Sequence, residues 1–334
     1  MSRAIDKRLK EALKHGDHAI VYEKIADALG LRLGELLEIE FLAPSHVLHQ
    51  DTYFLQDGNA LAIPKLSLLQ AFIPARRILQ EYRNGQGGTA EEALRATAVI
   101  LLLDPEHLTA ANTRKRLLLK RKPMERDLKG LLQTEMYFID SLLTSRLHRH
   151  TKSPTLWGHR EWLLERCKEA QVTLDVVEDL TKVVFISAER HPRNYYAWSH
   201  ARYLARGLQH SPNGQKETLA MIAELVKKWC LSHHNDTSGW SFLTTILARQ
   251  PQLARAVFSE TLQLTEKFRW RNESVWYFLR HMLLCEWVQD GERDEFEKVR
   301  LSLLDSAGGD GQDRRVLEQA GQWVAAYCMS VDSH

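Results

Sequence analysis

The chain has 334 residues, of which 44% are hydrophobic, and its 45 Lys and Arg against 43 Asp and Glu give a net charge of +2. This length exceeds one typical globular domain, but an array of repeats grows by addition and can stay one unit at such lengths. The near balance of charge gives no indication of a nucleic-acid partner or of a membrane surface.

Cysteine usage and hydropathy predict a soluble protein of the cytoplasm. The four cysteines, at 167, 230, 285 and 328, form no CxxC pair and no Cys/His cluster with zinc-ligand spacing, so we expect reduced thiols and no metal site on this chain. Residues 1–18 are charged and lack an apolar signal core. No apolar run approaches the ~18 residues that a membrane helix needs, so we expect no stable membrane insertion.

The first 88 residues predict a small appendage of helices and extended segments. Apolar spacing predicts two helices over residues 3 to about 30. Residues 36–62 alternate apolar and polar side chains and contain the turn pair Asp57-Gly58, which favours a hairpin or a pair of extended segments. Pro64 then opens a helix that holds Pro74 as a kink. The glycine-rich residues 84–89 are interpreted as the border of the appendage.

From Thr89 onward the pattern is helical throughout, and we divide it into a repeat region over 89–291 and capping helices over 292–334. Prolines near the first turn mark several helix starts. The predicted helices lie at roughly 89–103, 109–120, 123–145, 155–170, 173–190, 195–208, 214–231, 238–248, 252–267, 273–289, 292–306 and 312–330.

A loop-into-helix motif recurs along this region. Residues 191–204 read HPRNYYAWSHARYL, and related runs surround Trp157, Trp240 and Trp276, so that Trp198 and its counterparts stand about 40 residues apart. A fainter copy has Ala111 in the tryptophan's place. Two helical patterns per period predict an all-α array of about five helical hairpins, in which each hairpin buries its apolar face on its neighbours.

The repeated aromatic and histidine residues are predicted to be structural. A tryptophan at the point where two hairpins meet buries a large ring, which supplies on the order of 1.5 to 3 kcal/mol or more. His159 and His200 each follow a tryptophan by two positions. Their recurrence favours a shared hydrogen-bonding role over a metal site, because no partner ligands with suitable spacing are found.

The run PxNYxAWxHR resembles the alpha-subunit repeat of the protein prenyltransferases, and the resemblance covers about residues 90–290. It implies an α-α superhelix in the shape of a crescent, with structural roles for the residues that match the motif: Trp157, His159, Arg160, Trp198, His200, Trp240 and Trp276. The longer N-terminal region is more similar to a divergent branch of the family, which pairs with the Rab-type beta subunit to form a third geranylgeranyltransferase.

The resemblance also implies how the chain takes part in chemistry. The family's beta subunit holds the zinc and most of the pocket for geranylgeranyl diphosphate, so no catalytic residue is expected on this chain alone. The family's diphosphate-binding lysine corresponds to Arg193, followed by Asn194 and Tyr195, and Lys152 occupies the equivalent place one repeat earlier. A solvated turn residue remains the alternative for Arg193, and more so for Lys152, whose following residues depart from the family.

Other departures and a charged stretch qualify this expectation. The arginine that follows the family's tryptophans is displaced to Arg202, with Ala201 in its place, and becomes Leu243 in the next repeat. Residues 114–126 (RKRLLLKRKPMER) are strongly basic and are interpreted as a solvated outer face, with docking of an acidic surface or an anionic lipid as the alternative. Because Cys328 is followed by six residues, we expect that the chain is not itself a CaaX substrate.

Two functions therefore stand as hypotheses. The first is the alpha-type subunit of a protein geranylgeranyltransferase, partnered by a beta subunit and acting on a protein with a C-terminal cysteine. The second is a non-enzymatic helical-repeat adaptor that recruits protein partners, which the missing repeat arginines motivate. The residues alone decide neither the substrate protein nor the length of the isoprenoid.

Overall fold

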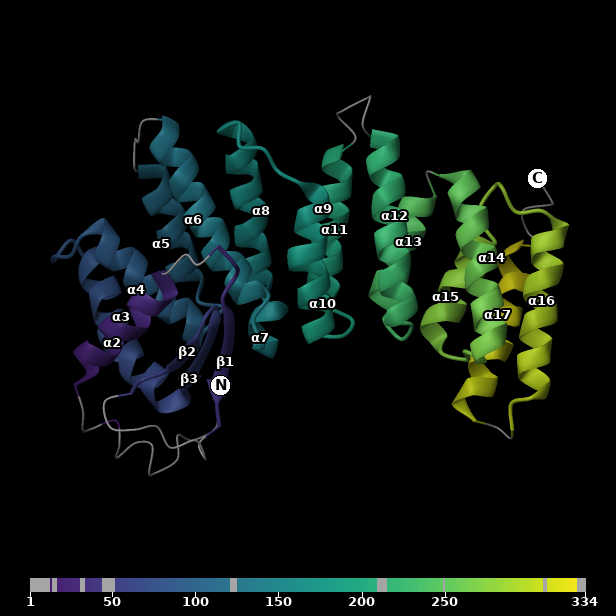
Figure 1. Ribbon diagram of the computed structural model, residues 1–334, viewed down its shortest axis with the longest axis horizontal. Coiled ribbons are helices and arrows are strands. Elements are labelled where there is room, and N and C mark those ends of the chain that lie inside the picture. The colour runs from purple at the N-terminus through teal and green to yellow at the C-terminus, as the bar shows by residue number, and fades with distance from the viewer. Residues whose placement is uncertain are drawn as a thin grey trace. The chain divides into compact units, whose positions relative to one another are not determined.

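The computed structural model describes residues 13, 17–30, 34–43, 52–120, 125–208, 215–248, 250–308 and 311–328. It is an all-α repeat fold with one small sheet, as predicted, and it forms two compact units, Met1–His200 and Ala201–His334 (Figure 1). Most of the first predicted helix lies outside the described residues. The crescent is a property of the whole array and stays a prediction.

The N-terminal part of the first unit confirms the mixed helical and extended pattern. Helix α2 (His18–Gly30) precedes strands β1 (Glu38–Leu42), β2 (Leu55–Asp57) and β3 (Ala60–Pro64). The predicted hairpin is β2–β3, and β1 joins it by pairing in parallel with β3, giving the order β1-β3-β2. Gly58 supplies the positive φ of 54° that the hairpin turn requires.

This sheet is joined to the helices that follow it. The hydroxyl of Tyr137 donates to the Glu35 carbonyl at 2.8 Å, and the Arg146 amide donates to the Ile39 carbonyl at 2.9 Å. The Leu37 amide donates to Ser141 Oγ at 3.1 Å. The edge of β1 is thereby covered by residues of the repeat region, which satisfies backbone groups that an open edge would leave unpaired.

The glycine-rich connector at 84–89 is a turn between packed helices. Helices α3 (Lys65–Arg83), which contains the buried Pro74, and α4 (Ala90–Leu103) pack along each other beside α2 (Figure 1). Thr89 and Glu92 form a capping box at the start of α4. The compact units divide later, after His200, and the predicted boundaries at 88/89 and 291/292 stay predictions.

The repeat helices follow the predicted segments closely, with three differences. The helix predicted over 273–289 ends at Met282, and a short helix over His148–Thr151 was not predicted. The segment predicted as one helix over 173–190 is α9 (Val176–Asp179), a π-helical stretch (Leu180–Phe185) and α10 (Ile186–Arg190). The remaining helices are α5 (Leu108–Lys120), α6 (Glu125–Leu143), α7 (His148–Thr151), α8 (Pro154–Glu169), α11 (Tyr195–Gly207), α12 (Gln215–Ser232), α13 (Thr237–Leu247), α14 (Pro251–Phe268), α15 (Glu273–Met282), α16 (Asp290–Asp305) and α17 (Gln312–Cys328).

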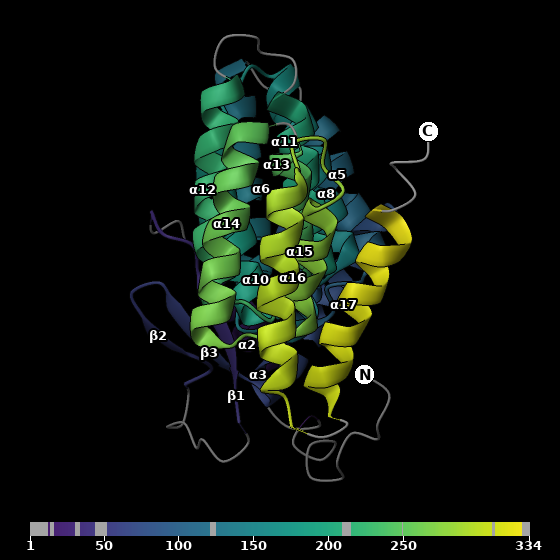
Figure 2. The same ribbon diagram turned by 90° about the vertical axis from the view of Figure 1, so that its right-hand side faces the viewer.

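The second unit shows the repeat packing clearly. Helix α15 packs between α13 and α17, while α14 packs between α12 and α16 (Figure 2). Alternate helices therefore form two layers, and the helices that begin with the tryptophan motif share one of them. This is the arrangement that a helical-hairpin array requires.

Each repeat tryptophan is buried, and the indole N–H of Trp157, Trp240 and Trp276 bonds the loop before its own helix. Trp157, Trp240 and Trp276 donate to the carbonyl six residues earlier, at 2.8, 3.1 and 2.9 Å respectively. Trp198 is likewise fully buried. All four rings are buried at equivalent positions of their repeats, as a packing role requires, and burial of a tryptophan ring is compatible with a satisfied N–H.

The residue four positions before each tryptophan caps the helix. Ser153, Asn194, Asp236 and Asn272 each accept a hydrogen bond from a backbone amide of the first turn. Three of these caps also reach the preceding repeat: Ser153 Oγ donates to the Pro105 carbonyl at 3.2 Å, Asn194 Nδ2 donates to the Thr151 carbonyl at 2.7 Å, and Asn272 Nδ2 donates to His234 Nδ1 at 2.9 Å. One side chain therefore starts a helix and ties two repeats together.

We expect Asn194→Ala to lower the free energy of unfolding by about 2 kcal/mol or more, because it removes a cap and leaves a buried carbonyl with one donor fewer. Asn194→Ser is the matched variant, since Ser153 performs both tasks at the equivalent position, and we expect it to cost clearly less. Urea denaturation of the purified chain measures both. Equal losses for the two variants would contradict the proposed double role.

Candidate functional site

The loop before α11 carries three of the candidate residues. Arg193 is exposed and has a left-handed backbone, with φ of 59°, which a non-glycine residue adopts only where its surroundings impose it. Tyr195 is 68% exposed at the start of the helix, whereas Asn194 is 1% exposed. Contact with a ligand is therefore open to Arg193 and Tyr195, while Asn194 holds the loop in place.

Lys152 lies on the neighbouring loop. It is exposed and directly follows Thr151, whose carbonyl accepts the Asn194 hydrogen bond. That bond sets the two loops side by side, so Lys152 and Arg193 belong to adjoining loops although they are 41 positions apart in the sequence. The structure thus brings together the two predicted cations of the site.

Two histidines complete this corner of the first unit. The Nδ1 atoms of His148 and His191 lie 3.4 Å apart. Burial, together with the positive charge of Lys152 and the neighbouring His148, lowers the pKa of His191. A nearby cation disfavours the charged form of an imidazole, and the same positive potential favours an anion at this surface.

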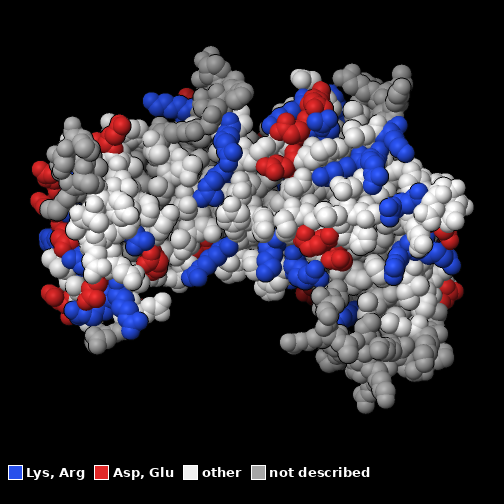
Figure 3. All heavy atoms as spheres, turned by 180° about the vertical axis from the view of Figure 1, so that it is seen from behind, with Lys and Arg blue, Asp and Glu red and all other residues white. Residues whose placement is uncertain are grey.

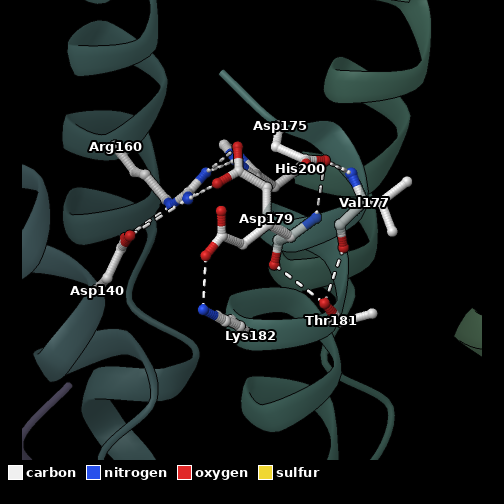
Figure 4. A network of polar contacts seen from close by, with 9 residues as sticks. Asp140, Arg160, Asp175, Val177, Asp179, Thr181, Lys182 and His200 are labelled. Carbon is white, nitrogen blue, oxygen red and sulfur yellow. Dashed lines mark hydrogen bonds and ion pairs between the residues drawn. The ribbon is translucent and has the colours of Figure 1, made fainter. Parts of the chain in front are cut away.

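A buried arginine three positions after the tryptophan organises the core behind the loops. Arg160 lies between two carboxylates, with its Nε 2.7 Å from Asp140 Oδ1 and its Nη2 2.7 Å from Asp179 Oδ1 (Figure 4). Its Nη1 donates to Nε2 of His200 at 2.7 Å. Because that nitrogen accepts, His200 is neutral, and burial together with Arg160 holds its pKa well below the ordinary value.

A related arrangement, with one carboxylate instead of two, occurs one repeat earlier. Arg114 forms a bidentate pair with Glu135, at 2.7 Å through Nε and 2.6 Å through Nη2, and all of these atoms are buried. Nε2 of His159 lies 3.3 Å from Glu135 Oε1, without hydrogen-bond geometry. Although burial alone would raise the pKa of Glu135, the attraction and hydrogen bonds of Arg114 hold it below the ordinary value.

This pairing corrects the interpretation of the basic stretch. Arg114, taken with residues 114–126 as a solvated face, is 6% exposed and ion-paired. Lys115 lies over the Trp162 ring at 5.6 Å, and burial lowers its pKa. Arg116 and Lys120 are exposed as expected, while residues 121–124 lie outside the described part of the chain. The sequence pattern missed the burial because charge runs do not show which member faces the core.

Later repeats keep the shape of this core without its charges. The position of the arginine is taken by Ala201, Leu243 and Leu279, all fully buried. Phe278 occupies the histidine's position and packs on Trp240 with ring centroids 4.8 Å apart, as His200 packs on Trp157 at 5.0 Å. Apolar residues at these positions therefore preserve the stacking of repeats. This agrees with the general finding that replacing a buried ion pair by well-packed apolar groups often changes the stability of a protein little.

The displaced arginine of the Trp198 repeat has a different role. Nη2 of Arg202 donates to Ser241 Oγ at 2.9 Å, and its guanidinium lies over the Phe242 ring at 5.9 Å. It thus reaches the helix of the next repeat from a partly exposed position.

The described residues contain neither a metal-binding cluster nor a membrane-spanning helix. Among the described residues, no group of three or more His, Cys, Asp or Glu side chains is placed to hold a metal ion. No described helix is both long enough and apolar enough to cross a membrane. The carboxylates of Glu135, Asp140 and Asp179 escaped the sequence prediction; the signal that was available is the repeated arginine itself, which requires acidic partners when buried.

The buried neutral histidines generate a prediction on pH. Burial is the main cause that lowers the pKa of His150 and of His159 to about 4. These folded-state pKa values lie below the unfolded value of roughly 6.5. Between about pH 6.5 and pH 4 the unfolded chain therefore binds more protons than the folded chain, so stability is lost as pH falls from about 6.5 towards about 4. One such histidine accounts for roughly 3 kcal/mol over that range.

We therefore expect His159→Phe to flatten the fall of the unfolding midpoint between pH 6.5 and pH 4 and to cost little at neutral pH. Phenylalanine already occupies the equivalent position at Phe278, and Arg114 still pairs with Glu135. Thermal unfolding followed by circular dichroism across this pH range is the measurement. His148→Gln, at an exposed position, serves as the control. If the unfolding midpoint of His159→Phe fell with pH as steeply as that of the unmodified chain, the role of His159 in acid sensitivity would be contradicted.

Comparisons with known proteins agree with the repeat geometry. A family model described as the ECM9 middle domain matches residues 156–268. The chain is 29% identical over 188 residues to the protein prenyltransferase alpha subunit repeat-containing protein 1 of Danio rerio, covering 50% of this chain and 40% of the relative. It is 27% identical over 212 residues to protein ECM9 of Saccharomyces cerevisiae, covering 62% and 54%.

A more distant match is the geranylgeranyl transferase type-2 subunit alpha of Dictyostelium discoideum, 24% identical over 159 residues, with 47% of each chain covered. The chain thus spans about half the length of the curated relatives it matches. Buried tryptophans in one register, capped helices and these matches together establish that this chain is similar, at the family level, to the prenyltransferase alpha-subunit-repeat proteins.

Proposed function

We propose that the chain is the alpha-type subunit of a heterodimeric protein geranylgeranyltransferase. It pairs with a zinc-bearing beta subunit of the Rab type, and the complex transfers an isoprenoid from its diphosphate to a cysteine near the C-terminus of a protein. The zinc and the lipid pocket belong to the partner, where the metal would favour the thiolate of the substrate cysteine.

The observation that carries this proposal is the geometry of the two adjoining loops. Arg193 stands five residues before Trp198, in a left-handed backbone next to a buried cap, and Lys152 lies on the loop that Asn194 binds through Thr151. A guanidinium and an ammonium on fixed loops suit a leaving diphosphate, whose charge grows as its bond to the isoprenoid breaks. Exposed Tyr195 adds a phenolic donor.

Co-expression tests the partnership. A tagged chain expressed with a Rab-type beta subunit is expected to purify as a stable 1:1 complex that transfers geranylgeranyl to a peptide with a C-terminal cysteine, while the chain alone shows no transfer. Mass spectrometry of the complex and of the peptide reads both outcomes. Absence of both complex and transfer would overturn the proposal.

Within that complex, we expect Arg193→Ala to lower kcat/KM by about tenfold to a hundredfold, because a hydrogen bond to a charged group contributes roughly 1.5–3 kcal/mol. Arg193→Lys keeps the charge and should retain much of the rate. Arg206→Ala, an exposed arginine near the other end of α11, is the control. Steady-state kinetics with geranylgeranyl diphosphate, with the complex checked by gel filtration, separates a loss of chemistry from a loss of assembly.

The second candidate is a non-enzymatic adaptor that recruits protein partners. The apolar residues Ala201, Leu243 and Leu279 favour it, because they replace the polar core of the earlier repeats. A transfer rate that is the same in Arg193→Ala and in the unmodified complex, with partner binding intact, would support the adaptor over the enzyme subunit.

A further inference from the structure

A polar pocket lies in the first unit and shares no residue with the Arg193 loop. It is a cavity of about 470 Å³ between the turn that joins α3 to α4 and one face of α5. Its wall includes Arg83, Arg116, Lys120 and Thr113. The volume falls within the range of small-molecule sites, ~300–1,000 Å³.

The charge of this pocket has one sign. Arg116 and Lys120 are four residues apart on α5, so they lie on the same face of that helix, and Arg83 approaches from the end of α3. No carboxylate lines the pocket, and among the described residues none of the three cations forms an ion pair. Figure 3 shows Lys and Arg atoms gathered over part of the first unit, at the upper right of the face drawn there.

The glycine turn leaves this wall open. Gly85, Gly87 and Gly88 line the pocket with φ of 67°, 150° and 85°, a backbone path that other residues rarely adopt. A Cβ built on Gly85 or Gly87 would meet nothing within 4 Å, so these glycines are required by conformation and leave free space beside the main chain. Glu92, which follows the turn, bonds the Thr89 amide at 2.6 Å instead of the cations.

A buried hydroxyl gives an independent observation. Thr113 is 4% exposed, and its Oγ1 has no hydrogen-bond partner among the described residues. Other helical threonines, among them Thr97, Thr244, Thr261 and Thr265, donate to the carbonyl four residues earlier. An unsatisfied buried hydroxyl is costly, and an acceptor held beside α5 would remove that cost.

We propose that this pocket binds a phosphate group of a polyanionic small molecule, held by Arg83, Arg116 and Lys120, with the Thr113 hydroxyl as a further donor. Guanidinium groups pair with phosphate in a bidentate manner, and ammonium adds a point charge. The lining is polar, which disfavours an apolar ligand. The site is independent of the proposed transferase activity, since no residue of the Arg193 loop takes part.

Two probes distinguish the source of the phosphate. Isothermal titration of the full chain with inositol 1,4,5-trisphosphate tests a soluble phosphate ester, and flotation with phosphatidylcholine vesicles with or without phosphatidylinositol 4,5-bisphosphate tests a lipid headgroup. We expect saturable 1:1 binding in at least one arm, and the arm that binds identifies the source. Failure of both arms would overturn the proposal.

Variants test whether the binding occurs in this pocket. Arg116→Ala and Lys120→Ala should each weaken it by about tenfold, as expected when a charge-assisted hydrogen bond is lost. Arg77→Ala, an exposed arginine of α3 outside the pocket, is the control. Binding that all three variants weaken equally would indicate nonspecific attraction and contradict the site.

Thr113→Val removes the hydroxyl and keeps the shape. Since the buried Thr113 hydroxyl has no partner to lose and its burial is costly, we expect equal or higher thermal stability without ligand and weaker binding of the phosphate probe. A drop in stability with unaltered binding would show that the hydroxyl serves the fold instead.

Discussion

The carbonyl of Thr151 is the point on which the first unit's functional surface depends. It accepts hydrogen bonds from Trp157 Nε1 at 2.8 Å, from Ser187 Oγ at 3.0 Å and from Asn194 Nδ2 at 2.7 Å. These donors come from its own repeat, from the helix that packs on it and from the next loop. One backbone group therefore fixes both the burial of the tryptophan and the placement of the following repeat, and an unpaired group at this depth would be costly.

The repeats differ in the side chains that fill their cores. The early repeats bury Arg114 and Arg160 with carboxylates and neutral histidines, whereas the later ones bury leucine and phenylalanine at the same positions. Both solutions satisfy the requirement that a buried charge be paired or absent. The charged version adds sensitivity to acid, because its histidines must stay neutral, and it specifies which side chains meet across neighbouring helices.

Two groups of exposed cations in the first unit are positioned by different parts of the fold. The Arg193 and Lys152 loops are held by the hydrogen bonds to the Thr151 carbonyl. They belong to the repeated motif by which the chain resembles the prenyltransferase alpha-subunit-repeat proteins. The Arg83, Arg116 and Lys120 pocket is built by a glycine turn and one helix face, outside that motif. Each presents cations on a fixed backbone, which is the property that anion recognition requires.

The sequence by itself determined the repeat, the helices and the buried tryptophans, because a large apolar ring that recurs with a capping residue four positions earlier has few alternatives to packing between hairpins. It also indicated the β2–β3 hairpin through Asp57-Gly58. Only the tertiary structure decided that Arg114 is buried, that Asn194 serves the core while Tyr195 faces solvent, and that residues 84–88 line a pocket. These outcomes depend on contacts between segments tens of residues apart, and local periodicity carries no information on which partner a charged side chain meets.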